Sequence, residues 1–415
     1  MNWLLGLFVG ALAAETTVRL WLGSRQIAAV RAHRDRVPEV FHGQIALADH
    51  QKAANYTVAR TRLGRWAILV EALIKLLFTV GGGLAGVDAL IGHLNWREPW
   101  HGCVVILAVL FLLQLLGLPF TLWRTFRIEA RFGFNRISPK LFIVDLAKRM
   151  LLGLVLGAPL AWVTLALMER AGRWWWVWAW LVWMGASLSL TWAAPRFIAP
   201  LFNRFTAITD KTLKDRIATL LERCGFAAGG GVFVMDGSRR SAHGNAYFTG
   251  IGRNKRIVFF DTLLARIELD EIEAVLAHEL GHFRLNHVRL RLIISQVVAL
   301  AGLALLGWLA REPDFYRVFG VPNSASMALL LFAFTMPAFT FFATPIAAWW
   351  SRRQELAADD FATQFTRPGD LSTALIKLYR DNASTLTPDR VHSGFYDSHP
   401  PAVLRITRLQ RLALQ

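Results

Sequence analysis

The sequence is poor in cysteine, with only Cys103 and Cys224 among its 415 residues. These two residues lie far apart in unlike segments, so the sequence predicts neither a disulfide framework nor a cysteine metal site. It also has no low-complexity tract and no short-period repeat. Hydrophobicity and charge are therefore the features that carry information about its class.

Acidic residues are also few, because 29 Asp and Glu stand against 46 Lys and Arg, which gives a formal net charge of +17. Hydrophobic residues make up 54% of the chain, including 17 Trp and 28 Phe. That share exceeds what a soluble globular protein usually carries. The basic residues lie between long apolar runs and not in one polar domain. This pattern favours a membrane topology, and we expect no nucleic-acid partner.

The first apolar run, residues 3–22, has no Lys or Arg before it. A secretory signal peptide has a positive segment at that place, so we expect a retained membrane span, although Ala11-Leu12-Ala13 resembles a cleavage site. The loop expected at 24–65 is rich in arginine. By the positive-inside rule this loop is cytoplasmic, and the N-terminus is then outside.

Six further apolar runs complete a set of seven expected spans: 66–94, 101–123, 150–168, 174–194, 288–309 and 325–350. A second basic loop, 124–149, is also expected in the cytoplasm. The prediction is an all-α polytopic membrane protein, with spans 1–5 in residues 1–194 and spans 6–7 in residues 288–350. Glu71 and Lys75 lie four residues apart in the second span, and we expect them to pair inside the protein.

Two polar segments, 195–287 and 351–415, are expected on the cytoplasmic side. An amphipathic helix is predicted at 210–223. Three short β runs follow at 232–235, 245–250 and 256–260, and the turn-like Gly252-Arg253-Asn254-Lys255 separates the last two. The sequence therefore predicts a small α+β domain with a sheet before its next helix. An edge strand of such a sheet can hold an extended substrate by backbone pairing, and a purely structural sheet is the compatible alternative.

That next helix carries His278-Glu279-Leu280-Gly281-His282 in a run without proline. The two histidines are four residues apart and share one face, so each can give a nitrogen to one Zn²⁺ at about 2.0–2.1 Å. Glu279 can accept a proton from a water molecule that zinc activates. This is the H-E-x-x-H pattern of metalloproteases. A surface helix with two solvated histidines is the alternative interpretation.

A second helical stretch, 351–361, supplies candidates for the rest of a metal site. Catalytic zinc keeps three protein ligands and one open position. Glu355 can be the third ligand, and Asp359, four residues later on the same face, can accept a hydrogen bond from the outer N–H of a ligand histidine. A solvated charged helix is the alternative, but the H-E-x-x-H pattern favours zinc, and we expect one Zn²⁺ per chain.

Several stretches together resemble the integral-membrane zinc metalloendopeptidases of the type I CAAX prenyl protease family. They are Phe132-Gly133-Phe134-Asn135, Pro200 to Phe205, Arg240-Ser241 through Asn245 to Phe248, His278 to His282, Ser351 to Asp359, and Ser398-His399-Pro400-Pro401 with Arg405. The H-E-x-x-H motif alone is shared with many proteases. The asparagine-containing strand, the Glu355 helix and the His-Pro-Pro segment, in this order with seven spans, are much more specific.

The resemblance implies a fold in which seven helices enclose a water-filled chamber with the zinc site at its cytoplasmic end. It implies that Glu355 is the third ligand and that Asn245 and His399 flank the metal, binding substrate or steadying the oxyanion. It also suggests that Arg405 supports the site from behind. The implied partners are the lipid bilayer and a peptide or membrane-protein substrate, such as a prenylated C-terminal peptide. Short loops and a compact length suit a bacterial inner-membrane member.

Two other functions remain open at this point. Ionisable residues within spans can mark a conduction path, which would suit a transporter or channel. The second open function is a membrane-protein quality-control factor that binds partners and for which proteolysis is a secondary activity. Loss of Glu279 discriminates between transport and hydrolysis, because transport would survive it and peptidase activity would not. The sequence leaves the oligomeric state and the native substrate undetermined.

Overall fold

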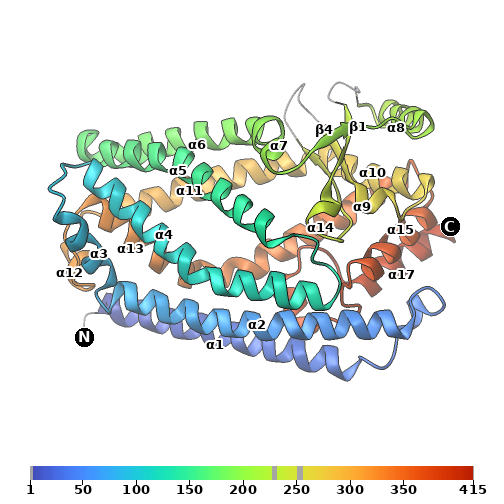
Figure 1. Ribbon diagram of the computed structural model, residues 1–415, viewed down its shortest axis with the longest axis horizontal. Coiled ribbons are helices and arrows are strands. Elements are labelled where there is room, and N and C mark those ends of the chain that lie inside the picture. The colour runs from blue at the N-terminus through green and yellow to red at the C-terminus, as the bar shows by residue number, and fades with distance from the viewer. Residues whose placement is uncertain (1–2, 227–230, 250–255, 415) are drawn as a thin grey trace.

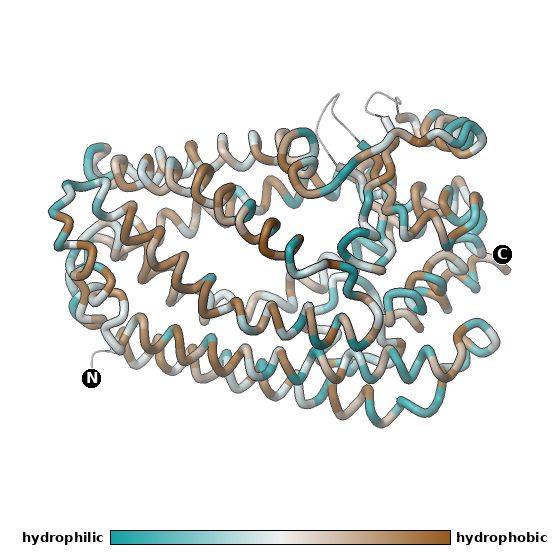
Figure 2. The backbone as a smooth tube through the Cα atoms, in the orientation of Figure 1, coloured by the Kyte–Doolittle hydropathy of each residue, from teal (hydrophilic) through white to brown (hydrophobic). Residues whose placement is uncertain are grey.

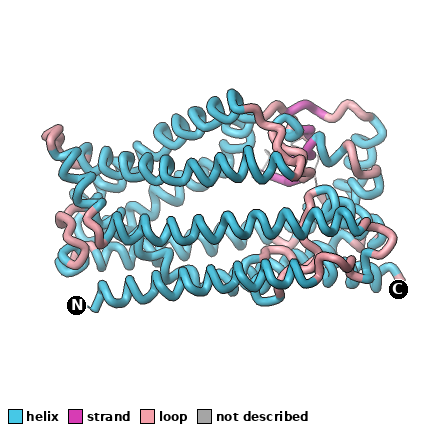
Figure 3. The backbone as a smooth tube through the Cα atoms, turned by 60° about the horizontal axis from the view of Figure 1, so that its bottom comes forward, coloured by secondary structure: helices cyan, strands magenta, loops and turns pink. Residues whose placement is uncertain are grey.

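The computed structural model describes residues 3–226, 231–249 and 256–414. Its longest helices run side by side along the long axis of the molecule, and the strands gather at the end where the C-terminus lies (Figure 1). Figure 3 shows the same division, with the strands confined to one end of a helical body. The site-bearing end and the membrane helices therefore form distinct regions of one fold.

Six helical segments in the described chain are long and apolar enough to cross a membrane, and a bent helix pair makes seven when counted as one span. The single segments are α1 (Trp3–Ala32), α4 (Trp100–Trp123) with the π-helix η2 (Arg124–Glu129), α5 (Pro139–Arg170), α6 (Trp175–Ala193) with η3 (Gly172–Trp174), η4 (Ala194–Ile198) and α7 (Ala199–Phe202), α11 (His287–Leu309), and α13 (Ala325–Thr340) with η7 (Phe341–Ala343) and α14 (Thr344–Ala362). The short α12 (Pro313–Arg317) lies between α11 and α13. The predicted fold class, a polytopic helical membrane protein with a small sheet, is confirmed.

The span expected at 66–94 is broken. It consists of α2 (Leu47–Thr79) and α3 (Gly83–Gly92), which meet at an angle of 53°. Gly82 has φ +76°, a left-handed conformation that glycine adopts without strain. A Cβ atom on the neighbouring Gly81 would lie 2.7 Å from the Leu77 carbonyl oxygen, so the tight bend needs glycine there as well.

The region 24–65, predicted as a cytoplasmic connection between the first two spans, is mostly helical. α1 continues to Ala32 and α2 begins at Leu47, so only residues 33–46, with the short η1 (Glu39–Phe41), connect them. Hydropathy marks the part of a helix that faces lipid, whereas the same helix continues into water where arginine and alanine keep it stable.

Charged side chains within the bundle are paired. Lys75 Nζ lies 3.0 Å from Glu71 Oε1 and 3.3 Å from Glu15 Oε2, so the expected Glu71–Lys75 pair is present. Arg19 Nη1 contacts Glu15 and Glu71, each at 2.9 Å. Two cations therefore balance two carboxylates between α1 and α2, as expected of ionisable groups at membrane depth.

The sheet has four strands in the order β1-β2-β4-β3. They are β1 (Phe205–Ala207), β2 (Val232–Met235), β3 (Ala246–Thr249) and β4 (Arg256–Phe260). The three predicted strands are confirmed, and the three-residue β1 was not predicted. β3 pairs with β4 in antiparallel register from Ala246↔Phe259 onward and forms one edge of the sheet. The expected turn at Gly252 to Lys255 lies outside the described residues.

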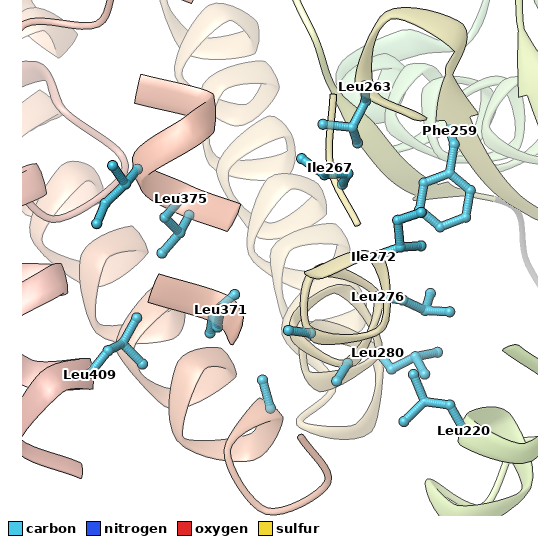
Figure 4. Packing of buried hydrophobic residues seen from close by; sticks show 14 of the residues in the cluster. Leu220, Phe259, Leu263, Ile267, Ile272, Leu276, Leu280, Leu371, Leu375 and Leu409 are labelled. Atoms are coloured by element: carbon cyan, nitrogen blue, oxygen red, sulfur yellow. The ribbon is translucent and has the colours of Figure 1, made fainter. Parts of the chain in front are cut away.

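A hydrophobic core joins the sheet to the helices around it. These helices are α8 (Lys211–Arg223), α9 (Asp261–Leu264), α10 (Leu269–Arg284), the end of α14, α15 (Pro368–Asp381) and α17 (Ala402–Ala413). The short η5 (Gly237–Arg239) follows β2, and α16 (Arg390–Tyr396) lies between α15 and α17 in the chain. The predicted helix at 210–223 corresponds to α8, with Asp210 as its N-cap. In Figure 4, Leu276 and Leu280 of α10 lie on the same side of this helix as Phe259 of the sheet and Leu220 of α8, and Leu371 of α15 lies on its other side. Figure 2 shows polar residues gathered at this end, whereas α4 and α5 are mainly apolar.

Candidate active site

The helix α10 is fixed at its start by a capping box. The backbone N–H of Glu268 donates to Glu271 Oε2 at 2.8 Å, while the Glu268 side chain accepts from the backbone N–H of Glu271. Lys377 of α15 donates to the same Glu271 carboxylate at 2.8 Å. One face of α10 is buried in the core, so its rotation about its own axis is set. His278 and His282 consequently point together toward α14.

A glycine lets α10 approach α14 closely. A Cβ atom on Gly281 would lie 3.2 Å from the Cα and carbonyl oxygen of Ala358 and 3.2 Å from the Cβ of Phe361. Backbone atoms cannot give way as a flexible side chain can. The glycine in the middle of the histidine motif therefore sets the distance between α10 and the helix that carries Glu355.

His278, His282 and Glu355 form a cluster whose ligand atoms all lie within 4.8 Å of one another. The Nε2 atoms of the two histidines are 3.3 Å apart. Glu355 Oε2 lies 3.4 Å from His278 Nε2, and Glu355 Oε1 lies 3.3 Å from His282 Nε2. All three side chains are largely shielded from solvent, with 9%, 15% and 5% exposure.

These spacings match what a tetrahedral zinc ion requires. Ligand atoms at about 2.0–2.1 Å from one ion lie about 3.3–3.4 Å apart at tetrahedral angles. Glu355 Oε2 is moreover a buried oxygen with no hydrogen-bond partner among the described residues. A buried carboxylate oxygen of this kind is costly unless a cation satisfies it. The residues present therefore fit a bound divalent metal.

Asp359 and Arg405 contact the side of His278 that faces away from Glu355 and His282. His278 Nδ1 lies 2.9 Å from Asp359 Oδ1 and can donate to it, which leaves Nε2 directed at Glu355. Arg405 of α17 donates twice to the Asp359 carboxylate, at 2.7 and 2.6 Å. The buried guanidinium balances the charge of the buried carboxylate, and the two fix the ring of His278.

Glu279 sits one residue beyond His278, and its side chain forms no hydrogen bond with another described residue. Burial raises the pKa of the Glu279 carboxyl above its ordinary value. A raised pKa makes a carboxylate a better proton acceptor near neutral pH. The Glu279 carboxylate is thus free to accept a proton from a group bound next to His278.

His399 and Asn245 occupy different places relative to the cluster. His399 Nε2 lies 3.4 Å from Glu355 Oε2, and the side chain is 61% exposed, so it borders the cluster from an open side. Asn245 immediately precedes β3, and its Oδ1 accepts from the backbone N–H of Ala246 at 2.9 Å. In the described chain Asn245 forms no hydrogen bond with the three clustered residues.

Comparison with known proteins gives this geometry its context. Residues 26–204 match the family described as CAAX prenyl protease N-terminal, five membrane helices, and residues 207–413 match peptidase family M48. A CAAX prenyl protease 1 homolog of Arabidopsis thaliana is 31% identical over 410 residues, covering 96% of this chain and 95% of that protein. CAAX prenyl protease 1 of Saccharomyces cerevisiae is 34% identical, with 90% and 88% covered.

A solved structure is similar along the whole chain. The crystal structure of S. mikatae Ste24p superposes with a TM-score of 0.91 at 28% identity, covering 99% of each chain. The chain belongs to peptidase family M48. It is an integral-membrane zinc metalloendopeptidase that crosses the membrane several times and acts on peptide substrates.

Three supporting residues of this M48 site were missed by the sequence analysis. His287, the first residue of α11, places its Nδ1 3.0 Å from His282 Nδ1. It thus contacts the outer ring nitrogen of His282, as Asp359 contacts the outer ring nitrogen of His278. Ser398 Oγ lies 3.0 Å from His399 Nδ1. Arg352 of α14 donates to the carbonyl oxygens of Ser393, Gly394 and Asp397 at 3.2, 3.1 and 2.8 Å.

Arg352 ties the segment before His399 to the helix that carries Glu355. Its three acceptors lie at the C-terminal end of α16, where the last carbonyls of a helix need partners from outside, although Ser393 O also accepts from the backbone N–H of Asp397. A positive charge at that end is also favourable because of the helix dipole. Only the Ser351-Arg352 pair in the resemblance could have drawn attention to it.

Proposed function

We propose that this chain binds one Zn²⁺ through His278, His282 and Glu355 and uses the site for peptide-bond hydrolysis at the cytoplasmic face of the membrane. The observation that carries the proposal is the triangle of ligand atoms with edges of 3.3–3.4 Å. Zinc at such a site polarises a carbonyl and makes water a nucleophile near neutral pH. The remaining steps belong to side chains of the protein.

Glu279 takes the proton of the attacking water and later gives it to the leaving amine. Its place beside His278 on α10, without being a ligand itself, suits both transfers. Asp359 and Arg405 hold the ring of His278 in one orientation through the reaction. His399, on the open side of the cluster, donates to the oxygen of the scissile carbonyl as negative charge develops on it.

The free edge of β3 holds the substrate as an added strand. β3 has β4 on one side and no described strand on the other. Backbone pairing would fix an extended segment beside α10, while Asn245 holds one of its carbonyl groups. Recognition through backbone groups gives weak sequence preference and requires an unfolded segment. Prenylated C-terminal peptides are proposed as one substrate class, because the similar proteins are named CAAX prenyl proteases.

The proposed layout has spans 1–5 in residues 1–194, the H-E-x-x-H segment in 195–287, spans 6–7 in 288–350 and the third ligand in 351–415. The basic segments 24–65 and 124–149 face the cytoplasm, as do both halves of the zinc site. The N-terminus then lies outside. We place the protein in a bacterial inner membrane, which suits its compact length and short connections.

Glu279→Gln tests the function directly. The variant keeps its metal, because Glu279 is not a ligand, and it loses turnover of a fluorogenic peptide by about 10²–10⁴-fold. His278→Ala loses both metal and turnover. Metal analysis and peptide kinetics on the same preparations separate the two effects. If Glu279→Gln retained wild-type kcat, the proposed mechanism would be wrong.

A further inference from the structure

A cavity of about 1160 Å³ opens beside Asn245, at the start of β3. Its wall is built by α2, η2, α5 and the segment 240–245. Four of the residues that line it are arginines: Arg60 of α2, Arg124 of η2, Arg149 of α5, and Arg240. Glu129 is the one carboxylate among the described lining residues. The cavity therefore carries an excess of positive charge.

The Glu129 carboxylate in the cavity wall already has partners within the protein. Tyr56 donates its hydroxyl to Glu129 at 2.8 Å, and His243 Nε2 lies 3.5 Å from the same carboxylate. Arg124 Nε is 3.9 Å from Glu129, the limit of a salt bridge. Glu129 is thus shared among Tyr56, His243 and nearby arginines, and one carboxylate cannot balance the charge of all the arginines in the wall.

The arginines differ in how they are held. Arg240 forms a two-point salt bridge with Asp145 at 2.7 and 2.9 Å and is part of the framework. Arg60 lies over the Tyr56 ring at 5.3 Å and forms no salt bridge with a carboxylate in the described chain. Arg149 is exposed to the cavity and likewise has no such salt bridge among the described residues. Arg60 and Arg149 remain available to an anion.

The positively charged cavity lies at the start of β3, so it would meet one end of a peptide that pairs with this strand. β3 runs from Ala246 to Thr249, and Asn245 at its beginning lines the cavity. A peptide that pairs antiparallel to β3 runs toward the cavity with its C-terminal side. A parallel peptide would bring its N-terminal side there. Clustered guanidinium groups attract a terminal carboxylate and repel a terminal ammonium group.

We infer that the arginine-lined cavity is a subsite for the free C-terminal carboxylate of the substrate, which lies antiparallel to β3 with Arg60 and Arg149 as its anion-binding residues. This inference rests on the proposed protease function and deepens it, because it fixes the orientation of the peptide. It makes the enzyme selective for scissile bonds near a free C-terminus. Arg60 and Arg149 are then specificity-determining residues outside the metal centre.

The test compares one fluorogenic peptide in two forms, with a free C-terminal acid and with a C-terminal amide. Wild-type enzyme is expected to cleave the acid with kcat/KM about 10- to 100-fold above the amide, mainly through KM, because a charge-assisted contact is lost in the amide. Arg149→Gln and Arg60→Gln lower this ratio toward one, and Arg149→Lys restores part of it. Arg127→Gln, in η2 but not in the cavity wall, keeps the ratio.

Binding to Glu279→Gln enzyme provides a readout that needs no turnover. Fluorescence anisotropy should show tighter binding of the acid than of the amide, and the difference should shrink in the Glu279→Gln, Arg149→Gln double variant. If wild type cleaves both forms equally and binding does not discriminate, the inference fails while the protease function stands. If wild type cleaves neither form although binding discriminates, the protease function fails and the carboxylate subsite stands.

Anionic lipid headgroups could also bind arginines near a membrane surface. The same kinetics are therefore repeated in nanodiscs of zwitterionic lipid and of lipid with an added anionic fraction. The inference predicts an acid-to-amide preference in both, and its loss in Arg149→Gln in both. It is overturned if Arg149→Gln changes the two peptides equally and only when anionic lipid is present.

Discussion

The membrane helices and the helices around the metal centre bury their apolar surface in different places. In α5, Leu151 and Val155 are 62% and 57% exposed on the protein surface. In α10, nine of the sixteen residues are buried inside the protein, among them Leu276, Leu280 and His278. The bilayer supplies the apolar surroundings of the first region, and the protein itself must supply those of the second. Precise packing between helices is therefore most critical at the metal centre.

After Glu279→Gln, His399→Ala is expected to have the largest effect that leaves the metal in place. Loss of a donor to the developing oxyanion costs about 10²–10³ in kcat, with KM little changed. Ser398→Ala removes only the partner of His399 Nδ1 and should lower kcat less. Steady-state kinetics with metal analysis measures both. Unchanged kcat in His399→Ala would remove this residue from the catalytic scheme.

Asp359→Asn tests how the metal centre depends on charges buried inside the protein. Loss of the carboxylate leaves Arg405 buried without its partner and frees the ring of His278. Metal affinity should fall by about 10–100-fold, measured by competition with a chelator. The adjacent Asp360 pairs with Arg408 on the surface, so Asp360→Asn should change little. Equal affinities in the two variants would contradict the supporting role of Asp359.

One substitution made in both regions should give opposite results. Gly281→Ala places a methyl group 3.2 Å from the backbone of α14 and should destabilise the protein by about 1–3 kcal/mol. Gly157→Ala in α5 meets no atom within 4 Å and should be neutral or stabilising, because alanine favours a helix. Thermal unfolding in detergent measures both. A stabilising Gly281→Ala would refute the close-packing account.

The two regions also differ in how much of them could be predicted. Hydropathy located the spans, because a helix that crosses the lipid bilayer needs a long run of apolar residues. It could not locate the helix ends at Ala32 and Leu47, since those parts of the helices are polar and leave no apolar run. The break between α2 and α3 was missed, although Gly81-Gly82-Gly83 is a visible signal for it.

At the metal centre, helical spacing sufficed for His278, Glu279 and His282, which share one helix. Glu355 and Asp359 could be predicted as candidates because they repeat the same spacing on a second helix, and the structure brings both beside His278. His287 and Arg352 were missed as supporting residues, because their contacts depend on how α11 and α16 pack against the site. Spacing in the sequence predicts which residues of one helix lie on the same face. Contacts between different elements can be predicted only from the fold or from a family resemblance.

The central claim is that His278, His282 and Glu355 hold a single catalytic zinc ion. Anomalous diffraction at the zinc edge, on crystals of the purified active enzyme, tests it most directly. One zinc peak per chain is expected, at about 2.0–2.2 Å from His278 Nε2, His282 Nε2 and an oxygen of Glu355. Fully active crystals without an anomalous peak between these three side chains would contradict it.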